Sequence, residues 1–382
     1  MHFKPPQGMA EAVRLTGAGR LSEATALIQQ MLRGGSPNPA TAPDPSIIDA
    51  EFTVLDPAPS SPRPRTGLGE TLRRLSRAVP GGQQGAFRPV APPAPEGASF
   101  TTASYHEAAG TRTYKLYVPA NRPAGPMPLI VMLHGCTQSP DDFAAGTGMN
   151  LAAEEHGFLV AYPEQPGSAN PNRCWNWFST VDQGRDRGEP ALIAGITRTI
   201  MCEHSVDPAR VYVAGLSAGG AAAVIMGSAY PDLYAAVGVH SGLPLGAARD
   251  MPSAFAAMRN GAAGGRRGAG PVPTIIFHGD QDTTVHPANG TAVAAQALGT
   301  TMGLRPTVSR GAVPGGRAYT RTIHADASGR DLCEHWEIQG AGHAWSGGSA
   351  SGSYTDPRGP DATREMVRFF LAHGRTAAAT AP

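Results

Sequence analysis

Residues 211–227 read VYVAGLSAGGAAAVIMG, and this stretch decides the fold prediction. Its first residues are rich in apolar β-formers, which predicts a buried strand, and the alanine-rich residues that follow predict a helix. Between them lies Gly215-Leu216-Ser217-Ala218-Gly219, a G-x-S-x-G sequence. In such a turn the glycines let strand and helix approach closely, so the serine hydroxyl stands exposed above the sheet. We therefore predict that Ser217 is a nucleophile.

The sequence on both sides of this turn, from Ala98 onward, alternates apolar runs with helical patterns. Strands are expected at residues 112–118, 129–133, 157–162, 211–214, 236–239, 274–277 and 336–338. Helices are expected at residues 145–155, 191–203 and 361–373. This alternation predicts a mostly parallel central sheet flanked by helices. Together with the serine turn, it predicts an α/β fold of the α/β-hydrolase type.

A serine nucleophile of this kind needs an acid. Its hydroxyl is weakly nucleophilic near neutral pH, so a base must remove the proton and a carboxylate must orient that base. Asp282 lies just past the apolar run at 274–277, at the carboxyl edge where sites of open α/β sheets form. The competing carboxylate, Asp280, adjoins the turn at Gly279 and is expected to cap or brace it. We therefore predict Asp282 as the acid.

The base is expected after the acid, because this fold carries its catalytic residues in the order Ser, Asp, His. His343 lies in a glycine-rich segment, IQGAGHAWSGG, after the last expected strand, where its ring can reach back over the serine. His286, four residues after the predicted acid, is its main rival. Structural roles are expected for His240, His278 and His335. His343 is therefore the predicted base.

Acyl transfer also needs amide donors for the tetrahedral oxyanion. One predicted donor is the backbone N–H of Ala218, which follows the nucleophile. The other is expected in the segment LIVMLHGCTQS, from the N–H of Cys136 or that of Thr137, and the sequence leaves that choice open. Cys136 could alternatively be a catalytic thiol, but Ser217 already occupies the nucleophile turn, which favours a packed or oxyanion role for the cysteine.

Four regions are predicted along the chain. Residues 1–34 form a helical N-terminal extension, residues 35–97 a linker rich in Pro, Gly and Ala, residues 98–375 the catalytic domain, and residues 376–382 a disordered tail. The extension carries apolar residues at helical spacing on both sides of Gly17-Ala18-Gly19. It is expected either to pack on its own protein or to dock on a partner or an apolar particle surface.

Composition excludes several classes of function. A formal net charge of +1 and a pI near 7.8 give no basic field for nucleic acid. No apolar stretch approaches the length of a membrane span, and the first residues lack the apolar core of a secretory signal. The four cysteines form no disulfide framework and no zinc-type CxxC pair. We therefore expect a cytoplasmic protein without a membrane span.

Five motifs resemble those of the polyhydroxybutyrate depolymerase family of esterases, which is related to feruloyl and acetylxylan esterases. They are LHGCTQS at 133–139, CWNWF at 174–178, GLSAGG at 215–220, HGDQD at 278–282 and GHAW at 342–345. The resemblance covers about residues 100–373. It implies cleavage of ester bonds in poly(3-hydroxybutyrate) or its oligomers through an acyl-serine, without a cofactor or metal. It also implies the catalytic roles given above to Ser217, Asp282 and His343.

Further residues gain a prediction from this resemblance. Trp175, Trp177 and Trp345 are candidates for an apolar wall that binds the acyl chain, although aromatic residues beside a site are often core. The family pattern also implies that Cys136 and Cys174 lie near each other, with bridging dependent on the compartment.

Two alternative functions remain open. The first keeps the chemistry and changes the substrate to feruloyl or acetyl esters of plant polysaccharide. The second is a granule-binding or partner-binding protein in which the extension carries the function and hydrolysis is residual. Since the sequence shows neither a signal peptide nor a downstream substrate-binding module, we expect a member that acts on intracellular storage granules or on soluble oligomers.

Overall fold

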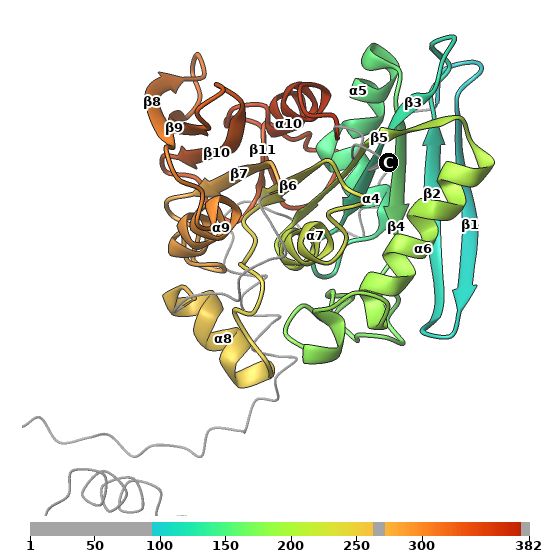
Figure 1. The fold of residues 1–382 in the computed structure, drawn as a ribbon, viewed down its shortest axis with the longest axis horizontal. Helices are drawn as coiled ribbons and strands as arrows, with labels where there is room; N and C mark the ends of the chain where they lie inside the picture. Colours follow the sequence, from blue (N-terminus) through green and yellow to red (C-terminus); the bar gives the residue numbers. More distant parts are fainter. Residues whose placement is uncertain (1–93, 263–271, 376–382) are drawn as a thin grey trace, which may run out of the picture. The chain divides into compact units, whose positions relative to one another are not determined.

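The computed structural model describes residues 94–262 and 272–375 (Figure 1). The predicted extension, almost all of the predicted linker and the predicted tail lie outside these residues. None of the helices in the described ranges has the length and apolar character needed to cross a bilayer.

The described residues form a sheet of ten strands, in the spatial order β1-β2-β4-β3-β5-β6-β7-β10-β9-β8. Their bounds are β1 (Ser99–Glu107), β2 (Gly110–Val118), β3 (Met127–Leu133), β4 (Leu159–Pro163), β5 (Val206–Leu216), β6 (Ala236–His240), β7 (Thr274–Gly279), β8 (Arg305–Ala312), β9 (Ala318–Ala325) and β10 (Asp331–Ile338). Two short strands, β11 (Trp345–Ser346) and β12 (Thr355–Asp356), pair separately.

The middle of the sheet is parallel and its two edges are antiparallel. Strands β4, β3, β5, β6, β7 and β10 run in one direction, whereas β1 and β2 at one edge and β9 and β8 at the other pair antiparallel. This confirms the predicted mostly parallel sheet. Because parallel strands end at the same edge, the loops after β3, β5, β7 and β10 all meet there.

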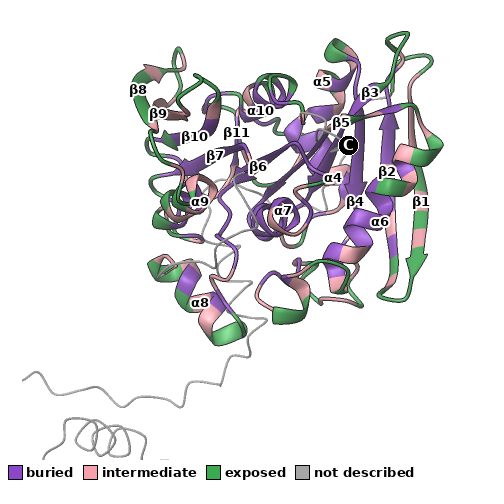
Figure 2. Ribbon diagram, in the orientation of Figure 1, coloured by how far each residue is buried: buried purple, intermediate pink, exposed green. Residues whose placement is uncertain are grey.

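Helices cover both faces of the sheet (Figures 1 and 2). One face packs against α6 (Gly188–Glu203), α7 (Ala218–Ala229), α8 (Met251–Asn260) and α9 (Ala288–Leu298). The other packs against α4 (Pro140–Thr147), α5 (Met149–His156) and α10 (Ala362–Leu371), and a short 3-10 turn, η1, spans Thr180–Asp182. Strand β3, MPLIVML, is buried along its whole length because helices lie on both of its sides.

One predicted helix was wrong. Residues 145–155 do not form a single helix, because Gly148 ends α4 and begins α5. Its φ of 65° lies in the left-handed region, which a continuous right-handed helix excludes and which glycine adopts without strain. The predicted helix at 361–373 corresponds to α10, which begins after Asp361, whose side chain accepts a hydrogen bond from the Arg364 N–H at 2.9 Å.

Candidate active site

Ser217 stands on a sharp turn between β5 and α7. Its backbone, at φ 58° and ψ −119°, lies outside the ordinary regions for a residue with a side chain, as a strained nucleophile turn requires. The Ser217 N–H donates to the His240 carbonyl at 2.9 Å. A Cβ on Gly215 would lie 2.3 Å from the backbone of Gly219, and a Cβ on Gly219 would lie 2.0 Å from the Leu133 carbonyl oxygen. The turn therefore needs glycine at both positions.

His343 and Asp282 are paired at the same edge of the sheet. His343 lies in the histidine loop, residues 339–344, which follows β10, and Asp282 follows β7. The ring Nδ1 donates to Asp282 Oδ2 at 2.7 Å. The other carboxylate oxygen accepts the N–H groups of Thr284, at 2.9 Å, and Val285, at 2.8 Å. These bonds hold the carboxylate in one orientation. Because Nδ1 of His343 is bonded to it, Nε2 is the ring nitrogen that can transfer a proton.

The environment of Asp282 keeps it ionised. Burial acts to raise its pKa, but the hydrogen bond and charge of His343, the nearby His278 and the Val285 N–H outweigh burial and lower the pKa to about 2. His278 Nε2 lies 3.5 Å from Asp282 Oδ2 and hydrogen-bonds the Val285 carbonyl at 2.8 Å. Burial lowers the pKa of His278, while the charge of Asp282 and the hydrogen bond to the Val285 carbonyl act in the opposite direction.

The competing residues lie elsewhere. The Asp280 carboxylate accepts the Gly340 N–H at 2.7 Å, so it braces the start of the histidine loop. His286 Nδ1 accepts the Ala288 N–H at 3.2 Å, at the beginning of α9. His335 is buried, and burial lowers its pKa to about 4. None of these groups pairs with His343 among the described residues.

His240 connects the serine turn to the histidine loop. Its carbonyl accepts the Ser217 N–H, and its ring Nε2 accepts the Ser346 N–H at 3.0 Å, just beyond the histidine loop. The ring stacks on Trp345 at 5.2 Å and on Phe277 at 5.9 Å between centroids. Among the described residues no hydrogen bond joins Ser217 Oγ directly to His343. Catalytic hydrogen bonds are often long before substrate binds, so this gap is compatible with a Ser–His pair. The contacts of His240 hold the serine turn close to the segment that follows the histidine loop.

The oxyanion loop, residues 134–138, follows β3 and approaches the serine turn. Thr137 donates its N–H to the Asn172 carbonyl at 2.7 Å, so this amide already has a partner. No hydrogen bond of the described residues occupies the Cys136 N–H, which leaves this amide, rather than that of Thr137, as the candidate second donor. The Ala218 N–H, in the first turn of α7, is the other candidate donor.

A second loop, residues 164–178, supports the oxyanion loop. Cys136 and Cys174 form a disulfide. The Trp175 indole N–H donates to the His134 carbonyl at 3.1 Å, and the Gln165 N–H donates to the His134 ring at 3.1 Å. Burial lowers the pKa of His134 to about 4, which keeps this ring neutral and able to accept. These contacts fix the backbone that carries the Cys136 amide.

A buried carboxyl group, that of Glu189, holds the loop at residues 164–178 in place. Glu189, at the start of α6, accepts the backbone and side-chain N–H groups of Asn176 at 2.8 and 2.7 Å, and it also accepts from the Gln165 amide. Arg112 lies 3.7 Å away. Burial raises the pKa of Glu189 to about 7, with the charge of Asp182 adding to this effect. No local pattern in the sequence points to this group, because its partners lie 13 or more residues away along the chain.

The three tryptophans do not form an exposed wall. Trp175, Trp177 and Trp345 are buried, with exposed fractions of 0%, 6% and 1%. The Trp345 indole N–H donates to Thr363 Oγ1 at 3.0 Å, and its ring packs edge-on against Phe143 at 5.5 Å. The core surrounds these side chains, so they form no exposed apolar wall, and their contact with substrate stays a prediction. The alternative that they are core residues is the one that the structure supports.

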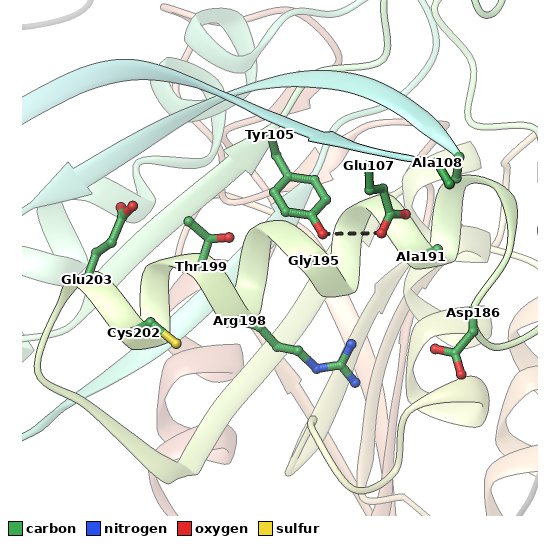
Figure 3. Close-up of a pocket in the computed structure, with 11 residues that line it drawn as sticks. Tyr105, Glu107, Ala108, Asp186, Ala191, Gly195, Arg198, Thr199, Cys202 and Glu203 are labelled. Atoms are coloured by element: carbon green, nitrogen blue, oxygen red, sulfur yellow. Dashed lines mark hydrogen bonds between the residues drawn. The ribbon is translucent and has the colours of Figure 1, made fainter.

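A pocket of about 440 Å³ lies away from these residues, between the β1–β2 hairpin and the outer side of α6 (Figure 3). Tyr105, whose hydroxyl donates to Glu107 at 3.2 Å, lines it together with Arg198 and Cys202. None of the predicted catalytic residues lines this pocket. Within the described residues, no group of three or more His, Cys, Asp or Glu side chains is arranged to hold a metal ion.

The fold and this arrangement define the class of protein. A mostly parallel sheet with a G-x-S-x-G turn after β5, an acid after β7 and a histidine after β10 is the α/β-hydrolase fold. The acetyl xylan esterase from Aspergillus awamori is similar in structure, with a TM-score of 0.55 and 20% sequence identity over 71% of this chain and 99% of that chain. This likeness concerns the fold alone.

The family follows from the sequence comparisons. The family model "Esterase PHB depolymerase" matches residues 112–315, more than half of the chain, and the chain belongs to this family. Poly(3-hydroxyalkanoate) depolymerase C of Paucimonas lemoignei is 37% identical over 240 residues, which are 59% of this chain and 57% of that protein. Poly(3-hydroxybutyrate) depolymerase of Ralstonia pickettii is 30% identical over 263 residues, 63% of this chain and 53% of that protein. The chain thus spans little more than half the length of these relatives.

Proposed function

We propose that this protein is a serine esterase that hydrolyses ester bonds of poly(3-hydroxybutyrate) or its oligomers. The observation that carries the proposal is the His343–Asp282 pair, at the sheet edge where the strained Ser217 turn also lies. The family, and two relatives whose names state polyhydroxyalkanoate or polyhydroxybutyrate depolymerase activity, support the substrate class.

Each residue has a defined role in the proposed reaction. His343 Nε2 removes the proton of the Ser217 hydroxyl while the oxygen attacks the ester carbonyl carbon. The N–H groups of Cys136 and Ala218 donate to the negative oxygen of the tetrahedral intermediate, an interaction typically worth about 3 to 4 kcal/mol per donor. The alcohol leaves with the proton from His343, and the ester bond has become an acyl-serine.

Water completes the cycle. His343 now removes a proton from a water molecule, which attacks the acyl-serine and releases the acid, and Ser217 recovers its proton. Asp282 stays ionised throughout, since its pKa is lowered to about 2. It orients the ring and stabilises the imidazolium that forms at each step. Neither step requires a cofactor.

The test compares the native protein with Ser217→Ala. We expect 3-hydroxybutyrate release from amorphous granules and from soluble oligomers to fall by at least about a thousandfold in the variant. The matched control is Ser228→Ala, the same substitution near the end of α7, the helix that follows Ser217. This variant should keep full activity. If the native protein cleaves feruloyl or acetyl esters but no hydroxybutyrate ester, the proposed mechanism stands and the proposed substrate is wrong.

We further propose that the protein acts in the cytoplasm, at the surface of storage granules, through the predicted helical extension at residues 1–34. Apolar residues at helical spacing in that segment support this placement. Deleting residues 1–34 should abolish cosedimentation with granules and leave cleavage of soluble oligomers unchanged. Cosedimentation that survives the deletion would remove the extension from the proposal.

The state of the cysteines tests the compartment independently. The structure contains a Cys136–Cys174 disulfide, whereas a reducing cytoplasm keeps thiols reduced. Protein that is denatured and alkylated at cell lysis should therefore carry all four cysteines in the alkylated form if it acts in the cytoplasm. Protection of Cys136 and Cys174 alone would instead indicate an oxidising compartment.

A further inference from the structure

Tyr354 lies between the oxyanion loop and β11, the short strand that directly follows the histidine loop. Its hydroxyl shares a 3.2 Å hydrogen bond with Thr137 Oγ1, next to the Cys136 amide. Its carbonyl accepts the Trp345 N–H at 2.7 Å, two residues after His343. The oxyanion loop lies against the serine turn at Gly219, and His240 links that turn to Ser346, so Tyr354 bridges two segments that lie close to the nucleophile.

The backbone at Tyr354 is strained although its loop is anchored elsewhere. Its φ of 52° is unusual for a bulky residue, and such outliers concentrate at functional sites. The preceding residue, Ser353, donates its N–H to Asp142 at 2.9 Å, and its carbonyl accepts from the Gln138 amide at 3.2 Å. The Ser349 N–H donates to the Gly146 carbonyl at 2.8 Å. The Tyr354 ring is therefore not needed to hold the loop in place.

The ring is also partly open to solvent. Its exposed fraction is 37%, whereas the three tryptophans near the site are almost fully buried. A tyrosine ring offers an apolar face, and here its hydroxyl end is already satisfied by Thr137. The acyl chain of an aliphatic hydroxyacid ester carries apolar methyl and methylene groups. The two surfaces are complementary.

We propose that Tyr354 contacts the substrate and sets the preference of the enzyme for acyl chain length, its ring covering the apolar part of the acyl chain beyond the ester carbonyl. This rests on the proposed esterase function. Since the ring contacts groups remote from the reacting atoms, it contributes to binding and leaves the chemical step unchanged. Longer acyl chains should therefore depend on Tyr354 more than acetate does.

The experiment measures KM and kcat of the full chain on p-nitrophenyl acetate and p-nitrophenyl hexanoate, and on the 3-hydroxybutyrate trimer. In Tyr354→Ala we expect KM for the hexanoate and the trimer to rise about tenfold, as loss of apolar burial predicts. KM and kcat for the acetate should stay within about threefold. Tyr354→Phe keeps the ring and loses only the hydroxyl, so its KM values should match those of the native protein.

Two results would overturn the proposed role of Tyr354, and a third separates it from the proposed substrate. Unchanged KM values in Tyr354→Ala overturn the proposal. An equal fall in kcat on both nitrophenyl esters also overturns it, because Tyr354 would then position the Thr137 segment. If the native protein cleaves the nitrophenyl esters but not the trimer, the polyester substrate fails while the nitrophenyl pair still tests Tyr354. Tyr354→Asn removes the ring in a residue that tolerates a left-handed backbone, should the alanine variant fail to fold.

Discussion

The close contact between the serine turn and the oxyanion loop predicts a strong effect of the substitution Gly219→Ala. A Cβ at this position would lie 2.0 Å from the Leu133 carbonyl oxygen and 2.6 Å from that of His134. The first distance is about 1.4 Å short of 3.4 Å, where ordinary van der Waals contact begins. Both obstructing atoms are backbone and cannot rotate away. The start of α7 or the oxyanion loop must therefore move by about 1 Å.

Such a movement should reduce catalysis more than stability. A displacement of about 1 Å in an active site costs about a hundredfold in rate, whereas overpacking typically costs about 1 to 3 kcal/mol of unfolding free energy. We expect kcat/KM on p-nitrophenyl acetate to fall by about a hundredfold or more in Gly219→Ala. Urea unfolding followed by circular dichroism measures the loss of stability in the same preparation.

The neighbouring glycine supplies the control. A Cβ on Gly220 would lie 3.1 Å from its nearest atoms, a shortfall of a few tenths of an ångström that small shifts can absorb. Gly220→Ala should therefore keep kcat/KM within about tenfold of the native value. A folded Gly219→Ala protein that is as active as Gly220→Ala would refute the tight coupling between serine turn and oxyanion loop.

Three more predictions concern the acid and the disulfide. Asp282→Asn should lower kcat by about a thousandfold or more with little change in KM, because an amide neither stabilises the His343 imidazolium nor fixes its tautomer; steady-state kinetics on a nitrophenyl ester measure this. The pKa of Asp282, lowered from 3.8 to about 2, should contribute about 2 kcal/mol of stability that is present above pH 4 and lost as the pH falls through 2. Urea unfolding across this range should show that loss in the native protein and not in Asp282→Asn. Reduction of Cys136–Cys174 should lower kcat by about tenfold, since it loosens one oxyanion donor; a Cys174→Ser variant that keeps native kcat would contradict this.

The sequence was sufficient for the fold and for the positions of the predicted catalytic residues. Ser217 and Asp282 follow strongly apolar runs, His343 follows the short run that ends β10, and parallel strands bring their carboxyl ends to one edge. Strands β1, β8 and β9 were not predicted, and β8 shows the physical reason. Strand β8, RPTVSRGA, is exposed along nearly its whole length and has no apolar alternation, so only its pairing with β9 makes it a strand.

The burial of side chains near the site was not predictable in the same way. Trp345 and Tyr354 are both aromatic residues in the glycine- and serine-rich stretch after His343, and sequence favoured the first as the substrate contact. Their environments differ because the indole of Trp345 finds a buried acceptor in Thr363, in α10. Tyr354 instead meets Thr137, more than two hundred residues earlier in the chain, at the surface. Both partners are long-range, and local pattern carries no information about them.

The relation of serine to histidine depends on a residue outside the proposed triad. His240 ends β6, which lies next to β5, the strand before Ser217, in the sheet. Its carbonyl holds the Ser217 N–H, and its ring Nε2 accepts from the Ser346 N–H, so this nitrogen must carry no proton. Burial lowers the pKa of His240 to about 3, which keeps the ring neutral wherever Asp282 is ionised and His343 is able to act as a base. Because a protonated His240 could not accept that bond, a neutral ring is what this link between the serine turn and the segment after the histidine loop requires.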